Sequence, residues 1–132
     1  MTPVPGEIAL LGLSACFVVL QIVLAAQLGN LQYGLRWAAS PRDEPVAPPG
    51  RLLGRLRRAL ANMLETFPLF AAAVLAVGVV HRLDLWSLIG AHLYFWARLA
   101  YLPLYLAGVP VVRSLVWNVA LLGIFMILWR LI

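Results

Sequence analysis

The stretch Ile8–Leu35 contains no Asp, Glu, Lys or Arg, and this constrains the fold more than any other feature of the sequence. A helix crosses the hydrocarbon core of a bilayer with roughly 20 residues, so the stretch is long enough for one span. Only helices and closed barrels satisfy their backbone hydrogen bonds in lipid. The stretch therefore predicts a transmembrane helix, which Pro5, Gly6 and Glu7 are suited to begin.

The composition extends this prediction to the whole chain. Hydrophobic residues make up 64% of the sequence and charged residues 11%, whereas a soluble domain has roughly 45–50% and about 25%. A chain with so few charges would expose large apolar patches in water. In a polar chain, the net charge of +5 would indicate a nucleic-acid partner. In so apolar a chain we expect membrane lipid as the surroundings and no nucleic-acid partner.

Prolines, glycines and charges divide the chain into four apolar segments. The expected spans cover residues 7–36, 55–80, 85–106 and 112–130, and a hydrophilic loop covers about residues 38–52. Open strands and irregular backbone are not viable in lipid. We therefore predict an all-α fold, an integral membrane four-helix bundle that forms a single domain over residues 1–132.

The distribution of arginine predicts the orientation. Six arginines surround the first loop, namely Arg36, Arg42, Arg51, Arg55, Arg57 and Arg58, whereas the second loop has Arg82 alone. Basic residues are enriched in cytoplasmic loops. We expect the first loop in the cytoplasm and both termini on the far side of a multi-pass protein, which in a bacterium would lie in the cytoplasmic (inner) membrane.

Three charged residues fall at membrane depth on three different helices. Counting about 1.5 Å per residue from the far ends, Glu65 lies roughly 22 Å, Arg98 about 20 Å and Arg113 roughly 25 Å along its helix. In a hydrocarbon core about 30 Å thick, all three belong to the cytoplasmic third. The sequence thus predicts one charged layer near the cytoplasmic face.

Helical spacing places these charges in polar stripes. One stripe consists of Arg51, Arg55, Arg58, Asn62 and Glu65, and the other of Tyr94, Arg98, Tyr101 and Tyr105. A charge at mid-bilayer costs roughly 2.5–3.5 kcal/mol on insertion scales. We therefore expect both stripes to face the bundle interior or a boundary between subunits.

Two interpretations of the charged layer remain open. In a structural network, Arg58 and Arg98 would neutralise Glu65. Together with Arg113, however, the arginines exceed Glu65 by two charges, which favours a pocket that binds an anion with Asn62 and tyrosine hydroxyls orienting it. A channel or transporter is less supported, because the polar layer does not continue to the far face.

Other patterns carry less information. His81 and His92 have no acid or cysteine at ligand spacing, so we expect no metal site. The sequence has no phosphate-binding glycine loop and no nucleophile motif. Trp86, Trp96, Trp117 and Trp129 are typical of interfacial or packing residues.

Three segments resemble a known family. Residues 55–70, RLRRALANMLETFPLF, resemble the second-helix signature R-x-x-R-A-x-x-N-x-x-E of the MAPEG family, the membrane-associated proteins in eicosanoid and glutathione metabolism. Residues 97–105 are similar to the third-helix pattern R-x-x-Y/H-x-x-x-Y, and Arg113-Ser114 resembles the arginine-serine pair of helix four. The resemblance covers nearly the whole chain and is closest to the small bacterial branch.

The resemblance implies a homotrimer that binds glutathione as co-substrate between neighbouring subunits near the cytoplasmic face. The residues implied to bind glutathione are Arg55, Arg58, Asn62, Glu65, Arg98, Tyr101 and Tyr105, with Glu65 facing the ammonium group. Arg113 is implied to stabilise the thiolate, and Ser114 is the rival partner of the thiol.

The chain also departs from characterised eicosanoid enzymes. It carries one residue more between Tyr105 and Arg113, and Ala61 and Thr66 stand where some members have arginine and tyrosine. The resemblance therefore implies a glutathione S-transferase or peroxidase acting on a lipophilic electrophile rather than eicosanoid synthesis. The alternative is a non-enzymatic membrane protein that binds an anionic lipid or small anion in the same pocket.

Overall fold

A computed structural model describes residues 4–132, and its secondary structure is helical. The elements are α1 (Gly6–Tyr33), α2 (Leu35–Ala38), α3 (Arg51–Val79), α4 (Leu85–Ala107), α5 (Pro110–Leu128) and the 3-10 turn η1 (Trp129–Leu131). No strand occurs among the described residues, so the prediction of an all-α fold is confirmed there.

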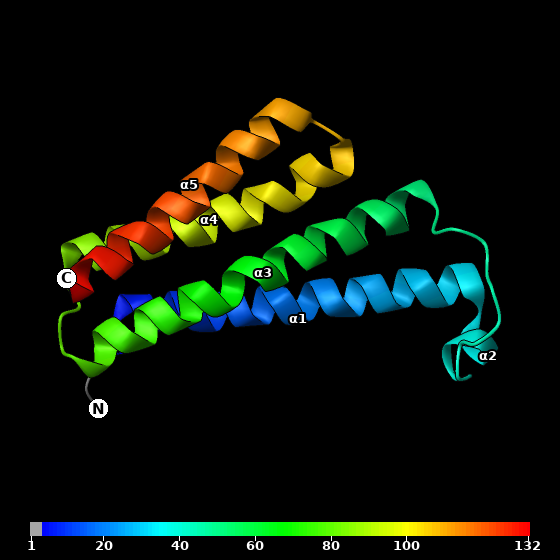
Figure 1. The fold of residues 1–132 in the computed structure, drawn as a ribbon, viewed down its shortest axis with the longest axis horizontal. Helices are drawn as coiled ribbons and strands as arrows, with labels where there is room; N and C mark the ends of the chain where they lie inside the picture. Colours follow the sequence, from blue (N-terminus) through cyan, green and yellow to red (C-terminus); the bar gives the residue numbers. More distant parts are fainter. Residues whose placement is uncertain (1–3) are drawn as a thin grey trace.

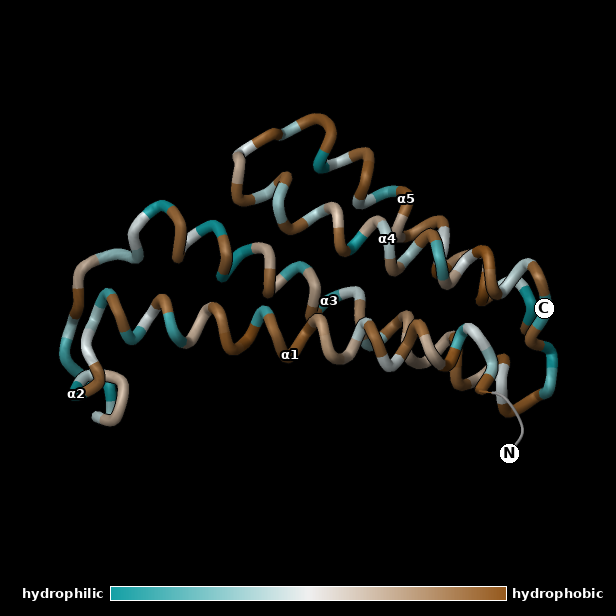
Figure 2. The backbone as a smooth tube through the Cα atoms, turned by 180° about the vertical axis from the view of Figure 1, so that it is seen from behind, coloured by the Kyte–Doolittle hydropathy of each residue, from teal (hydrophilic) through white to brown (hydrophobic). Residues whose placement is uncertain are grey.

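The long helices form two antiparallel pairs. Helix α1 lies beside α3, and α4 packs closely against α5 (Figure 1). The pairs meet at the end that carries the C-terminus and the start of α1, and they separate toward the end that carries α2. The view from behind shows the same separation (Figure 2). Helix α3 contacts all three of the other long helices and therefore joins the two pairs.

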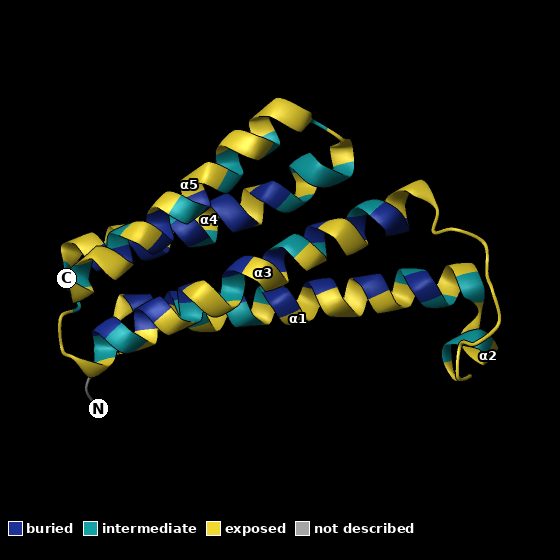
Figure 3. Cartoon of the chain, viewed as in Figure 1, coloured by how far each residue is buried: buried dark blue, intermediate teal, exposed yellow. Residues whose placement is uncertain are grey.

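The outer surface of the helices is apolar. Three helical stretches are long and apolar enough to cross a membrane, namely Gly6–Tyr33, Arg51–Val79 and Pro110–Leu131. Helix α4, with its buried Arg98, is not among them. Exposed residues cover the outward faces of all the long helices (Figure 3), and large apolar side chains such as Leu31 and Val79 are among them. Such a surface is suited to lipid rather than to water.

Helix α1 ends in a glycine turn and begins with a buried carboxylate. It ends at Tyr33, earlier than the predicted limit at residue 36, because Gly34 adopts φ 83° and turns the chain into α2. At its start, Glu7 is buried with 4% exposure and accepts a hydrogen bond of 2.5 Å from Ser87 Oγ at the start of α4. Asp84 caps α4 by accepting the backbone N–H of Ser87.

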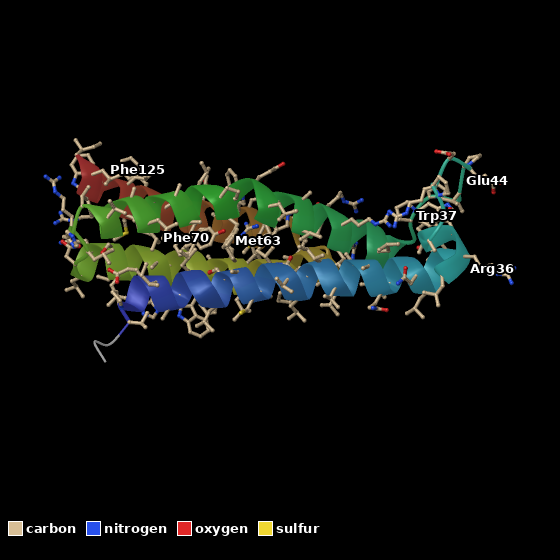
Figure 4. The ribbon with its side chains drawn as sticks, turned by 90° about the horizontal axis from the view of Figure 1, so that it is seen from below. Arg36, Trp37, Glu44, Met63, Phe70 and Phe125 are labelled. Atoms are coloured by element: carbon tan, nitrogen blue, oxygen red, sulfur yellow. The ribbon has the colours of Figure 1, made fainter. Side chains whose placement is uncertain are left out.

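The packed interior takes side chains from all four long helices, and its largest ones lie between α3 and α4. The ring of Phe70 stacks on that of Tyr94 with centroids 4.0 Å apart, and both side chains are fully buried. Met63 lies on the same inward face of α3, nearer the start of the helix than Phe70, as the side-chain view shows (Figure 4). This contact fixes the faces that α3 and α4 present to each other.

Two glycines bring α4 and α5 into backbone contact. A Cβ atom built on Gly90 would lie 2.6 Å from the carbonyl oxygen of Gly123, and one built on Gly123 would lie 2.5 Å from that of Gly90. Membrane helices approach this closely where both carry small residues. The crossing therefore has no room for a methyl group on either helix.

Gly123→Ala should lower the free energy of unfolding by roughly 1–3 kcal/mol, because one helix has to move away from the other. Gly12→Ala in α1 is the matched control, since a Cβ there meets no atom within 4 Å. Thermal unfolding in mild detergent, followed by circular dichroism, measures both variants. Equal melting temperatures would contradict the close backbone contact.

Candidate functional site

The centre of the site is the buried cation of Arg98 on α4. Its side chain is 2% exposed. Nη1 donates to Asn62 Oδ1 at 2.9 Å and Nε donates to Met63 Sδ at 3.3 Å, both on α3. The guanidinium carbon also lies 4.6 Å from the ring centroid of Tyr101. All these partners are neutral, and no ion pair joins Arg98 to a carboxylate within residues 4–132.

A second polar contact continues the layer between α3 and α4. The hydroxyls of Thr66 and Tyr94 lie 3.3 Å apart, and the Tyr94 hydroxyl lies 3.9 Å from Met63 Sδ. The thioether sulfur thus faces donors from two side chains of α4. Sequence reasoning did not select Met63, because methionine on a helix is ordinarily an apolar packing residue.

A small cavity joins α3, α4 and α5 beside this layer. It has a volume of about 130 Å³ and is lined by Asn62, Tyr101, Arg113, Ser114 and Trp117. The indole N–H of Trp117 is buried and has no hydrogen-bond partner among the described residues. A buried donor without a partner costs about 1–3 kcal/mol. Trp117, which the sequence suggested only as an interfacial or packing residue, thus lines the cavity and has a buried donor without a partner.

Arg113 lies at the rim of this cavity. Its guanidinium carbon is 4.4 Å from the ring centroid of Tyr105. The cation on α5 and the ring on α4 thus form a cation–π contact. The turn between them ends α4 at Gly108, with φ 81°, and begins α5 at Pro110. Ser114 is exposed and its hydroxyl donates to Pro110 O at 3.1 Å.

The remaining predicted residues lie on α3, outside the cavity. Arg55 Nη1 donates to Leu106 O at 2.7 Å and so binds the C-terminal end of α4. Arg58 and Glu65 are exposed. Among residues 4–132 the only ion pair joins Arg130 and Asp84, so the network in which Arg58 and Arg98 neutralise Glu65 is not formed.

The comparison with protein families agrees with this arrangement of helices. The sequence model of the MAPEG family matches residues 10–132, nearly the whole chain. The chain belongs to the MAPEG family. No curated protein and no solved structure matches it. Family membership and the three apolar stretches together make it a membrane protein.

In this MAPEG protein, the predicted residues divide into two groups. The structure brings together Asn62, Arg98, Tyr101, Tyr105, Arg113 and Ser114 around or beside the cavity. It leaves Arg58 and Glu65 exposed on α3, and Arg55 between α3 and the end of α4. The lining of the cavity within one chain therefore includes a cation and no carboxylate.

Met63→Leu should lower the free energy of unfolding by about 1–2 kcal/mol, because it leaves the Arg98 Nε–H without an acceptor while nearly keeping the volume. Denaturant unfolding in mild detergent provides the measurement. Met126→Leu is the control, since the Met126 sulfur accepts no hydrogen bond in the described part of the chain. In an Arg98→Met background, Met63→Leu should lower the free energy of unfolding by a smaller amount. An equal loss in both backgrounds would contradict the hydrogen bond between Arg98 and Met63.

Proposed function

We propose that the protein is a glutathione S-transferase or peroxidase of the MAPEG type that acts on a lipophilic electrophile. In this proposal it spans the membrane four times, forms a homotrimer and takes glutathione as co-substrate. The observation that carries the proposal is the buried guanidinium of Arg98, which has only neutral partners. A buried cation of this kind is stabilised when an anion binds beside it.

The donors of the site fit the charges of glutathione. Glutathione has two carboxylates and one ammonium group, and its thiolate adds a further negative charge. Arg98 and Arg113 supply two cations on neighbouring helices. Asn62, Tyr101 and Trp117 line the same cavity with polar groups, which provide the hydrogen bonds that orient a ligand.

The size of the cavity supports a site shared between subunits. Ligand pockets commonly hold about 300–1,000 Å³, so a cavity of about 130 Å³ accepts only part of a tripeptide. The rest would have to lie against the exposed face of α3, which carries Glu65 at its predicted membrane depth and Arg58 nearer the cytoplasmic end. A neighbouring subunit on this face would shield both charges from lipid and would bring Glu65 to the ammonium group.

The proposed chemistry begins with the thiol. Arg113 next to the sulfur lowers the pKa of the thiol and so supplies thiolate at neutral pH. In transfer, the sulfur forms a bond to the electrophilic carbon, the leaving group departs with the bonding electrons, and the thiol proton passes to solvent. In peroxide reduction, the sulfur attacks the outer oxygen, the O–O bond breaks and an alcohol leaves. A second glutathione then yields the disulfide and water.

The proposed orientation follows from the arginines around the α1–α3 connection. Arg36, Arg42, Arg51, Arg57 and Arg58 are exposed at that end of the molecule. Basic residues favour the cytoplasmic side of a membrane, which would place the glutathione site near the cytoplasm. Both termini would then lie on the opposite side.

Purified protein mixed with glutathione and an aryl halide should form thiolate and then the thioether, both of which absorb in the ultraviolet. Arg113→Ala should lower the rate of conjugation roughly hundredfold, because it removes the charge that stabilises the thiolate. Arg36→Ala, an equal change of charge on the exposed α2, should leave the rate unchanged.

Two outcomes would contradict the enzyme proposal. One is the absence of glutathione binding by calorimetry. The other is a conjugation rate that Arg113→Ala does not lower. Binding of an anionic lipid or small anion that depends on Arg98 and Arg113, without glutathione binding, would instead support the non-enzymatic alternative.

Light scattering in mild detergent should give the mass of a trimer. Glutathione should raise the temperature at which the trimer dissociates, because a ligand bound between subunits stabilises the assembled state. Arg58→Ala and Glu65→Ala should each abolish this rise, whereas Arg36→Ala should keep it. A mass that corresponds only to monomer or dimer would contradict the proposed assembly.

A further inference from the structure

A second candidate site lies at the opposite end of the molecule from α2. An apolar groove of about 400 Å³ is lined by Trp86, Leu122, Phe125, Met126, Trp129 and Arg130. A polar hollow of about 650 Å³ is lined by His81, Arg82, Asp84, Trp129 and Arg130, among others. Both share Trp129 and Arg130, so the apolar groove and the polar hollow are neighbours.

The polar hollow carries unused positive charge. Asp84 is already engaged, since one oxygen pairs with Arg130 Nη2 at 2.6 Å and the other accepts two backbone N–H groups of α4. Arg130 Nε is buried without a hydrogen-bond partner in the described part of the chain. Arg82 is exposed, and its Nη1 donates to the backbone oxygens of Arg130 and Leu131 at 3.3 and 3.5 Å. These long bonds hold the Arg82 cation at the hollow.

The apolar groove has the character of a membrane interface. Trp86, Phe125 and Trp129 are 61%, 58% and 59% exposed. Tryptophan is enriched where hydrocarbon meets lipid headgroups, and Arg130 and Arg82 line the polar hollow next to the groove. An acyl chain and a phosphate attached to it would therefore each meet a surface of matching character.

We propose that this groove and hollow bind one anionic phospholipid in the leaflet opposite the α2 end. An acyl chain lies along the groove beside Trp86, Phe125 and Trp129. The phosphate lies in the hollow against the guanidinium of Arg130 and faces the cation of Arg82. The net positive charge of the Arg82, Asp84 and Arg130 group selects an anionic headgroup over a zwitterionic one.

Native mass spectrometry of the delipidated protein tests this site with phosphatidylglycerol and phosphatidylcholine of identical acyl chains. The unmodified protein should bind phosphatidylglycerol about tenfold more tightly, which corresponds to about 1.4 kcal/mol. Arg82→Gln keeps the Arg130–Asp84 ion pair and should remove most of this preference. Arg36→Gln at the other end should leave it intact. Trp129→Ala should weaken the binding of both lipids.

Several results would overturn the proposal. They are equal binding of the two lipids, an equal loss of preference in Arg36→Gln and Arg82→Gln, and unchanged lipid binding in Trp129→Ala. Displacement of the lipid by millimolar glycerol phosphate would also overturn it, because the hollow would then bind a small anion without the groove. Arg82→Lys keeps the charge and should keep the preference for phosphatidylglycerol.

Discussion

The burial of the Arg98 guanidinium between α3 and α4 is the constraint on which the rest of the site depends. An amide oxygen, a thioether sulfur and a ring face hold the cation, and none of them carries a negative charge. Burying a charge without a counter-ion is costly, so α3 has to present Asn62 and Met63 at one level of α4. The same arrangement leaves a buried cation without a direct ion pair, which an anion bound beside it would stabilise.

Contacts at the two ends of the helices hold this layer in place. At one end, Arg55 reaches from α3 to the last carbonyls of α4, where the helix dipole favours a cation. At the other end, Ser87 contacts the buried Glu7 of α1, and Arg130 pairs with Asp84. The helices are therefore fixed on either side of the polar layer, which gives Arg98 a defined position rather than a flexible one.

Much of this arrangement follows from the sequence, but the rotation of each helix does not. Apolar length and the spacing of polar residues predicted the long helices and the stripe of α4, because both are local properties. The depth of Glu65, counted from residues, stays a prediction. Helical spacing, however, fixes only which residues share a face, not where that face points. The exposure of Glu65, the sulfur contact of Met63 and the unused N–H of Trp117 all depend on packing between helices.

The separation of Glu65 from Arg98 carries the strongest argument about assembly. One chain buries the cation of Arg98 and leaves the carboxylate of Glu65 exposed, and counting residues predicts both at about the same depth. An isolated chain would therefore expose Glu65 to lipid at a cost of several kcal/mol, with no gain in the stability of its own core. In the proposed trimer a zwitterionic ligand at the boundary offers carboxylates to the cations and an ammonium to Glu65. It would therefore lower both the cost of burying the Arg98 cation and the cost of exposing the Glu65 carboxylate. Binding of that ligand and association of the subunits would then stabilise each other.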